Sequence, residues 1–413
     1  MPDSTPTPAP APTNDQLAER FRPVFTRIAE TAVHREQHRE LAHDPVRWLS
    51  EAGFGAVRVP TSLGGFGASF EQFFDLRTEL AEADSNVPQI LRAHFGFIER
   101  LFSEVDGTQH HRRLKLAAGG TIFGNATTEL GDVALGKLKT RLYREGDGWL
   151  LEGDKFYSTG TLYADWVGVA AERELPGSPG TSERVLVQVP TDAPGVERLD
   201  DWRGFGQRLS ASGTTRFRNV RVQDDQILSS GRAGPTSMTA FFQLVHLATL
   251  AGIARAIERD AVAFVQKRKR VYSFGSGTSP REDPLVQQVI GQLASAAFIG
   301  ASAVQAVARG LGDIDRLRVR GEPVPNALLV DVELRMMKAQ VGVPDAVLGA
   351  ATRLFDVGGA SALQEDLRLD RHWRNARTLA SHNPTIYKAR VVGDHALNGK
   401  EPTFYWSVGT SEG

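Results

Sequence analysis

The chain has 413 residues, of which 41% are hydrophobic and 23% charged, with 48 basic and 49 acidic side chains and a net charge of −1. This length exceeds one hydrophobic core and predicts two or three packed units, while the near-zero charge gives no field that favours nucleic acid or an anionic membrane as a partner. Without cysteine, the chain cannot form a disulfide, a thiolate nucleophile or a sulfur-ligated metal site.

The first 14 residues alternate proline with small side chains, and they lack the basic start and apolar centre of a signal peptide. We expect a disordered tail and a cytoplasmic protein, because no stretch approaches the roughly 20 apolar residues that span a bilayer. Residues 15–120 then show helical spacing, with one apolar stripe at Leu17, Phe21 and Val24 and another between Phe70 and Leu80. They predict a helical first domain.

Residues 121–229 change to short alternating runs separated by glycine, proline and aspartate, the pattern of strands and turns. This region predicts an antiparallel β-domain, either a barrel or a sandwich. The runs that predict strands are 149–152, 166–169, 185–189 and 215–222.

Helical periodicity returns in residues 230–413. Long alanine-rich stretches at 285–310 and 326–355 are apolar over much of their surface, so each needs neighbours on several sides. We predict a helical bundle that also packs between subunits.

A cationic segment, residues 371–384, carries three arginines, two histidines and a tryptophan, and it should close one helix and open another. After Asp370 its charges are all positive, which favours contact with an anion or a cofactor. The alternative is a basic helix end that satisfies its own terminal carbonyls.

The sequence has no G-x-G-x-x-G between a strand and a helix, no P-loop and no H-E-x-x-H. A nicotinamide site within the chain is therefore not expected, and no metal site is predicted.

The cationic segment, together with Tyr387-Lys388 and GDHALNG at 393–399, resembles the C-terminal region of flavin-dependent monooxygenases with the acyl-CoA dehydrogenase fold. The dibenzothiophene monooxygenases and the sulfur-acquisition oxidoreductases are the members that it resembles most. The resemblance implies an α+β, mainly α fold, with an N-terminal helical domain, a central β-domain and a C-terminal bundle. Further matching segments follow in the family's order at 59–69, 123–131, 153–160 and 200–214.

Two of these segments offer amides and hydroxyls of the kind that match the donors and acceptors of a flavin ring, although such turns commonly satisfy only their own backbone. The resemblance places Asn125 in the active site and Ser158 at the reactive edge of the flavin. It places Trp202 near flavin and substrate, although a tryptophan on a β-domain is often a core residue. Our flavin assignment from the two segments comprises Asn125, Thr127, Thr128 and Ser158.

Two histidines are assigned to catalysis. His94 lies among apolar residues of an expected helix, where a lone histidine is usually a satisfied core residue, but the resemblance places an active-site histidine there. His382 falls near the turn where acyl-CoA dehydrogenases carry the glutamate that removes an α-proton. The turn here is Ser-His-Asn-Pro, without a carboxylate, so the base for dehydrogenation is missing, whereas a histidine can exchange a proton near neutral pH. Leu379 replaces an additional histidine of the dibenzothiophene enzymes.

Basic residues at the end of a long helix are the candidates for the flavin phosphate. Relatives use an arginine there, and Arg270 matches best, with Arg268 second; the alternative is a favourable charge at a helix C-terminus. Arg377 of the cationic segment is also assigned to the cofactor. A second phosphate arginine of the family is replaced by Ser361.

The resemblance implies a two-component monooxygenase that takes reduced FMN from a separate reductase and forms a C4a-hydroperoxyflavin with O2. Its substrate would be a small organosulfur compound, and the assembly a homotetramer. FAD in place of FMN remains open. The alternatives are an FAD-dependent acyl-CoA dehydrogenase, a flavin N-hydroxylase of an amine, and a non-enzymatic flavin-binding protein.

Overall fold

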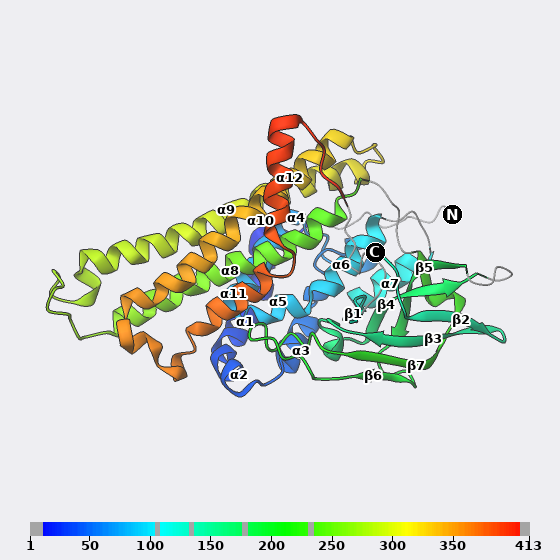
Figure 1. The fold of residues 1–413 in the computed structure, drawn as a ribbon, viewed down its shortest axis with the longest axis horizontal. Helices are drawn as coiled ribbons and strands as arrows, with labels where there is room; N and C mark the ends of the chain where they lie inside the picture. Colours follow the sequence, from blue (N-terminus) through cyan, green and yellow to red (C-terminus); the bar gives the residue numbers. More distant parts are fainter. Residues whose placement is uncertain (1–10, 104–107, 132–135, 176–180, 230–234, 405–413) are drawn as a thin grey trace, which may run out of the picture.

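The computed structural model describes residues 11–103, 108–131, 136–175, 181–229 and 235–404. Helices, strands and helices follow one another along the chain (Figure 1). The tail expected over residues 1–14 lies mostly outside the described residues, and the first helix already begins at Asn14. The N-terminal helices are α1 (Asn14–Glu30), α2 (Ala32–His38), α3 (His43–Ala52), α4 (Phe70–Ala83), α5 (Asn86–Ile90), α6 (Arg92–Ser103) and α7 (Thr108–Ala118).

Local sequence signals fix where these helices start. Thr13 before α1 and Ser69 before α4 each form a capping box, with a glutamine three residues later. The loop expected at residues 59–69 precedes α4 and contains one short 3-10 turn, Thr61–Leu63. The helical stripe predicted between Phe70 and Leu80 is confirmed as the buried face of α4.

The middle of the chain forms one hydrogen-bonded sheet of eight strands in the order β6-β7-β3-β2-β4-β5-β8, with β1 beside β4. All four predicted strand runs are confirmed. Its own core contains side chains from six of the strands, so the sheet encloses an apolar centre separate from that of the helices. The strands are β1 (Phe123–Ala126), β2 (Arg141–Glu145), β3 (Gly148–Lys155), β4 (Trp166–Glu174), β5 (Ser182–Pro190), β6 (Val196–Arg198), β7 (Thr215–Val222) and β8 (Ile227–Ser229).

The expectation of a purely antiparallel sheet is wrong. Both β1 and β2 run parallel to β4 and occupy successive parts of the same edge of that strand. Alternation of apolar and polar residues reports which face of a strand is buried and not the direction of its neighbour, so the sequence pattern could not distinguish the two cases.

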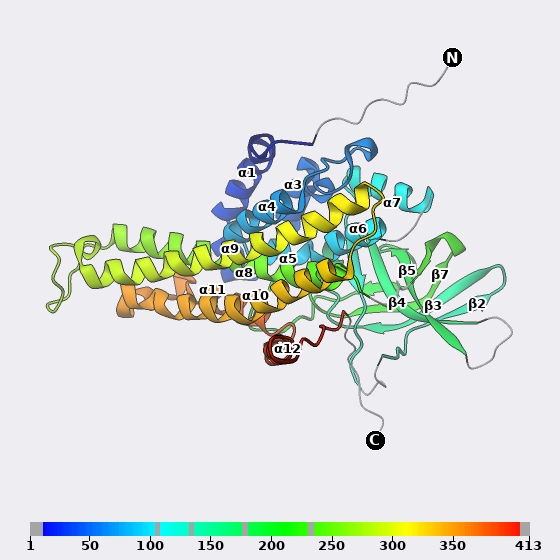
Figure 2. The same cartoon turned by 90° about the horizontal axis from the view of Figure 1, so that it is seen from above.

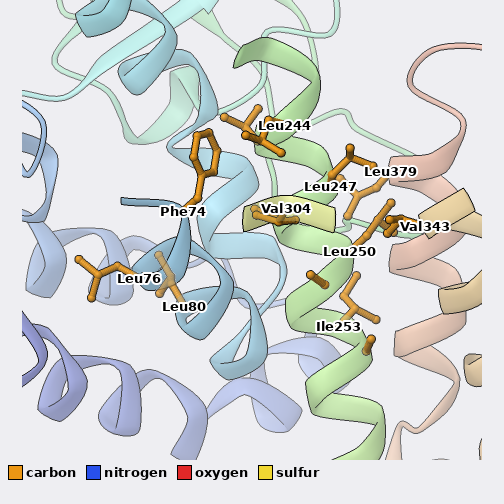
Figure 3. Packing of buried hydrophobic residues seen from close by; sticks show 14 of the residues in the cluster. Phe74, Leu76, Leu80, Leu244, Leu247, Leu250, Ile253, Val304, Val343 and Leu379 are labelled. Atoms are coloured by element: carbon orange, nitrogen blue, oxygen red, sulfur yellow. The ribbon is translucent and has the colours of Figure 1, made fainter. Parts of the chain in front are cut away.

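Five helices complete the chain, and α8, α9 and α10 extend side by side away from the sheet (Figures 1 and 2). Leu379 of α11 packs beside Leu247 of α8 in the shared core (Figure 3), which places the end of α11 against the middle of α8. The bounds are α8 (Met238–Lys267), α9 (Pro284–Val319), α10 (Asn326–Arg353), α11 (Asp370–Ala380) and α12 (Thr385–Asn398).

By length and composition alone, α8 and α9 could each cross a membrane, so the expectation that no segment is apolar enough does not hold for them. The apolar composition of α8 is explained by its central position, since 89% of its most apolar window is buried inside the protein, as in the core helix of a globular domain. The corresponding share for α9 is only 28%. This helix therefore presents an apolar surface that the described residues do not cover, including Phe298 and Ile299.

Candidate active site

A buried ion pair joins the ends of β1 and β3. Lys155 Nζ lies 2.6 Å from Glu129 Oε1, with side-chain exposures of 0% and 5%. Burial lowers the pKa of Lys155 to about 8, with Glu129 acting in the opposite direction. Although burial alone would raise it, hydrogen bonds from Lys155 and Thr140 lower the pKa of Glu129. The pair holds the two segments assigned to the flavin next to each other, since Thr128 and Phe156 also pair through their backbones.

Ser158 follows β3 in a turn that is fixed from two sides. Its backbone N–H donates to Gly213 O at 3.1 Å, and Gly160 lies so close to the carbonyl of Ile90 that a Cβ there would approach the oxygen to 2.2 Å. The hydroxyl of Ser158 is 2% exposed, and within the described residues it has no hydrogen-bond partner. A buried hydroxyl without a partner is uncommon and fits a bound polar molecule.

The neighbouring assigned residues are less buried. Thr127 Oγ1 donates to Asn125 Oδ1 at 2.6 Å, which leaves the amide nitrogen of Asn125 free of any recorded bond. Thr128 is exposed. Together with Ser158, these groups present donors and acceptors at one end of the sheet, and they fit the pyrimidine edge of a flavin.

The loop that carries Trp202 lies between the sheet and α11. The indole Nε1 of Trp202 donates to Gln207 O at 3.1 Å, and its ring meets Tyr157 edge-on at 6.0 Å. Gln207 N donates to Asn375 Oδ1 of α11 at 2.6 Å. Trp202 is half-buried at this boundary and not part of the sheet core, and its assignment to the flavin side stays a prediction.

His94 is completely buried, and both of its ring nitrogens bind backbone groups. Nδ1 accepts from Phe123 N at 3.2 Å and Nε2 donates to Gly55 O at 2.8 Å, while burial lowers its pKa to about 4. This geometry supports a structural role for His94, in which its neutral ring connects α6 to the first strand. Its catalytic role stays a prediction.

His382 lies in the turn after α11 and accepts a hydrogen bond at Nε2 from Arg92 Nη1, 3.0 Å away. Because arginine can only donate, the ring proton of His382 is on Nδ1. The ring of His246 on α8 lies 4.2 Å from that of His382, centre to centre. Water reaches His382, but the surrounding protein and the charge of Arg92 lower its pKa to about 3. At neutral pH it is therefore an uncharged donor.

The two assigned histidines do not share one site. Arg92 and His94 are two residues apart on α6, hence about 200° around the helix axis, and they make their contacts on opposite sides. His382 meets the Arg92 side, so the structure groups Arg92, His246 and His382 and places His94 on the opposite side of α6. The turn that carries Ser158 packs through Gly160 against Ile90, two residues before Arg92.

The chain is similar to several known proteins. A family model described as acyl-CoA dehydrogenase, C-terminal domain, matches residues 244–385. A probable FMNH2-dependent monooxygenase, SfnC, of Pseudomonas putida is 29% identical over 395 residues, 93% of this chain and 96% of that protein. A dibenzothiophene monooxygenase of Mycolicibacterium goodii is 29% identical over 391 residues, 90% and 91% of the two chains.

Among solved structures, the methanesulfinate monooxygenase MsuC from Pseudomonas fluorescens has a TM-score of 0.83 at 26% identity, covering 93% of this chain and 97% of that one. The chain is a homologue of flavin-dependent monooxygenases with the acyl-CoA dehydrogenase fold. The resemblance seen in the sequence motifs and the mainly α fold class expected from it are both confirmed.

In this homologue the cationic segment is mostly structural. Arg371 Nη2 lies 2.6 Å from Asp260, and Arg374 Nη1 lies 2.7 Å from Glu36. Apart from Asp370, which pairs with Arg374 from one helical turn away, the carboxylates that pair with the segment come from distant parts of the chain, so its purely positive local sequence was misleading. Arg377 is half-buried and binds Ser381 Oγ with two nitrogens, each at 3.1 Å, and its role toward the cofactor stays a prediction.

The two phosphate candidates lie at the far end of α8 from this site. Arg268 donates to Val357 O at 2.7 Å, and Arg270 is exposed. They follow His246 by more than 20 positions on or just beyond α8, which corresponds to about 30 Å of helix and exceeds the span of an FMN molecule. Within one chain they cannot reach the phosphate of a flavin whose ring lies beside His246, so their assignment stays a prediction that needs another copy. Ser361 lies in the 3-10 turn Gly359–Leu363.

Sequence reasoning missed Arg92 and His246. The available signal for His246 was its place in an otherwise apolar stretch of α8. For Arg92 it was its position two residues before His94, the histidine that we chose.

Over the part of the chain that the structure describes, no group of three or more histidine or carboxylate side chains could hold a metal ion.

Proposed function

We propose that this protein is a two-component monooxygenase that uses reduced FMN from a separate reductase and O2 to oxygenate a small organosulfur compound. The observation that carries the proposal is the chemistry of two groups: the buried Ser158 hydroxyl, which has no partner within the described residues, and Arg92 with His246 and His382. These groups can bind and orient oxygen-rich species, and they include no carboxylate. Homologues named for FMNH2 and for organosulfur substrates support it.

Reduced FMN would supply the two electrons that send one atom of O2 to the substrate and the other to water. Asn125, Thr127 and Ser158 would hold the polar edge of the ring, and Trp202 would cover it. His382 would hold a proton at Nδ1, directed by the Arg92 bond at Nε2. Exclusion of water by the packing of the Ser158 turn on Ile90 would limit the loss of reducing equivalents to hydrogen peroxide.

The test is oxygen transfer in the full two-component system. With NADH, a flavin reductase, FMN and 18O2, we expect the wild-type protein to place one labelled oxygen atom in a small sulfinate, sulfide or sulfone, as read by mass spectrometry. The control omits this protein and keeps the reductase. Products without the label, or labelled product only from amines, would refute the organosulfur proposal.

Acyl-CoA dehydrogenation is the second candidate function, because one buried carboxyl group could serve as its base. Glu333 of α10 is buried, and burial raises its pKa to about 7, which suits a base. It binds Thr239 at 2.8 Å, however, seven positions before His246 on α8 and hence about 10 Å along the helix. Anaerobic bleaching of oxidised flavin by acyl-CoA substrates, lost in Glu333→Gln, would favour this alternative.

We also propose a homotetramer that works in the cytoplasm, where a reductase can deliver reduced FMN. The apolar surface of α9 and the distance of Arg270 from the site of its own chain support an assembly in which copies cover one another. Light scattering on the purified protein should give the mass of four chains. If the proposal is right, Arg270→Ala should weaken FMN binding by roughly 10-fold or more, the effect of losing a charged hydrogen bond. A monomer that binds FMN unchanged in this variant would contradict it.

A further inference from the structure

Arg77, Arg92 and His246 form a cation-rich centre, and each contributes an atom without a partner. Arg77 is 0% exposed and its Nη1 is unpaired within the described chain, as is the buried Nε of Arg92. His246 is 4% exposed, and neither of its ring nitrogens has a recorded hydrogen bond. Such groups are normally satisfied when buried, so this centre lacks a component.

The missing component is negative. Burial, and then the charge of Arg92, lower the pKa of Arg77 to about 9, while burial lowers the pKa of Arg92 to about 10. Burial and the neighbouring His382, Arg92 and Arg77 push the pKa of His246 well below its usual value. No carboxylate of the described residues contributes to any of these shifts, whereas buried charges in proteins are usually paired.

The centre is also held in place. Arg77 donates through Nε to Val245 O at 3.2 Å and through Nη2 to Pro88 O at 2.7 Å. Val245 directly precedes His246, so Arg77 is tied to the same turn of α8. Arg92 is held through Nη1 by His382, which leaves its Nε side for a second ligand. Donors fixed before a ligand arrives bind it without a reorganisation cost.

We propose that Arg92, with His246 beside it and Arg77 behind it, is the receptor for an oxyanion group on the substrate. The substrate is then a small organic anion, such as an alkanesulfinate, and not a neutral sulfide or an aromatic thiophene. This inference rests on the proposed monooxygenase function, because it takes the His382 side of the site as the place of reaction. A guanidinium edge and an imidazole N–H are suited to two oxygens of one sulfinate or carboxylate head group.

Two sources could supply such an anion: the substrate, or the flavin through its phosphate or its reduced ring. We favour the substrate, because the flavin ring is already assigned to Ser158 and its neighbours, while Arg92 of α6 and His246 of α8 have no part in that assignment. The experiment keeps both sources apart.

The test measures binding alone, without turnover. Methanesulfonate and dimethyl sulfone have nearly the same shape and differ in charge, and calorimetry in a buffer free of phosphate and sulfate measures the affinity of each for FMN-loaded protein. We expect methanesulfonate to bind at least 10-fold tighter than dimethyl sulfone. Arg92→Met should remove this preference, with a loss of about 10- to 100-fold for the anion, and Arg92→Lys should restore part of it. Arg22→Met, an exposed arginine paired with Glu79, is the matched control and should leave both affinities unchanged.

FMN titrations of the same variants decide the source of the anion. Oxidised and reduced FMN should bind Arg92→Met as they bind the wild type. Weaker FMN binding with unchanged methanesulfonate binding would assign the centre to the flavin and overturn the inference. Equal affinity of the wild type for methanesulfonate and dimethyl sulfone would overturn it as well, even if Arg92→Met does not fold. Failure of oxygen transfer with intact anion binding would instead count against the proposed function.

Discussion

His382→Ala should lower product formation by about 10²–10⁴-fold, the range for a positioned proton donor or acceptor, while the protein still binds reduced FMN and still consumes O2. The reason lies in the ring itself, which holds its proton at Nδ1 because Arg92 occupies Nε2. Without it, the electrons should leave as hydrogen peroxide instead of reaching the substrate. Simultaneous assays of product, NADH and hydrogen peroxide measure this division.

The control for this variant is His38→Ala, an exposed histidine at the end of α2 whose Nδ1 contacts only the backbone of its own helix. It should leave the ratio of product to peroxide unchanged. Full coupling in His382→Ala would show that this residue handles no proton in the reaction. The low pKa of His382, about 3, means that in the proposed reaction the residue would start from its neutral form at neutral pH.

Lys155→Met should destabilise the protein by about 3–5 kcal/mol, the usual cost of leaving one buried charge without its partner. Glu129 would keep its bonds to Thr140 and Lys139 but lose the only opposite charge recorded beside it in the described structure. Since the pair joins the ends of β1 and β3, FMN binding should weaken together with stability. Urea unfolding, followed by FMN titration of the folded protein, measures both.

Arg218→Met is the matched control on the neighbouring strand. Arg218 lies 2.7 Å from Asp154, with side-chain exposures of 47% and 59%, and such exposed pairs contribute only about 0–1 kcal/mol. The double variant Lys155→Met/Glu129→Gln should recover part of the stability, because neither charge is then left alone. A loss in Lys155→Met no larger than that in Arg218→Met would contradict the role given to the buried pair.

The sequence predicted the helices well, because the buried faces of α4 and α10 repeat with the period of a helix, while α8 is apolar and buried on nearly all sides over its first two thirds. Strand direction was not encoded in this way, and the parallel pairing of β1 with β4 depends on contacts that no local pattern reports. The ion pairs of Arg371 and Arg374 also join residues more than 100 positions apart. Their positive sequence therefore implied a ligand where the fold supplies its own carboxylates.

For the candidate site, the sequence motifs led to Ser158, Asn125 and His382, since these residues lie in segments whose sequences resemble those of the monooxygenase family. They could not show that α6 separates His94 from His382, because the direction of a side chain around a helix matters only once its neighbours are placed. Arg92 and His246 were missed for the same reason. Each lies in an ordinary helical segment, and only its contact with His382, in the turn after α11, suggests a chemical function.

Arg77 has a consequence for the evolution of the protein. A guanidinium that is 0% exposed, with one nitrogen unpaired in the described structure and a second arginine close enough to lower its pKa, makes the fold less stable than an apolar residue of the same size would. Most proteins have little stability to spare, so selection for folding alone would remove such a residue. Its presence identifies the contact between α4 and the first third of α8, where Arg77 meets Val245, as a place where selection has accepted a weaker fold, as is usual at sites that must bind or react.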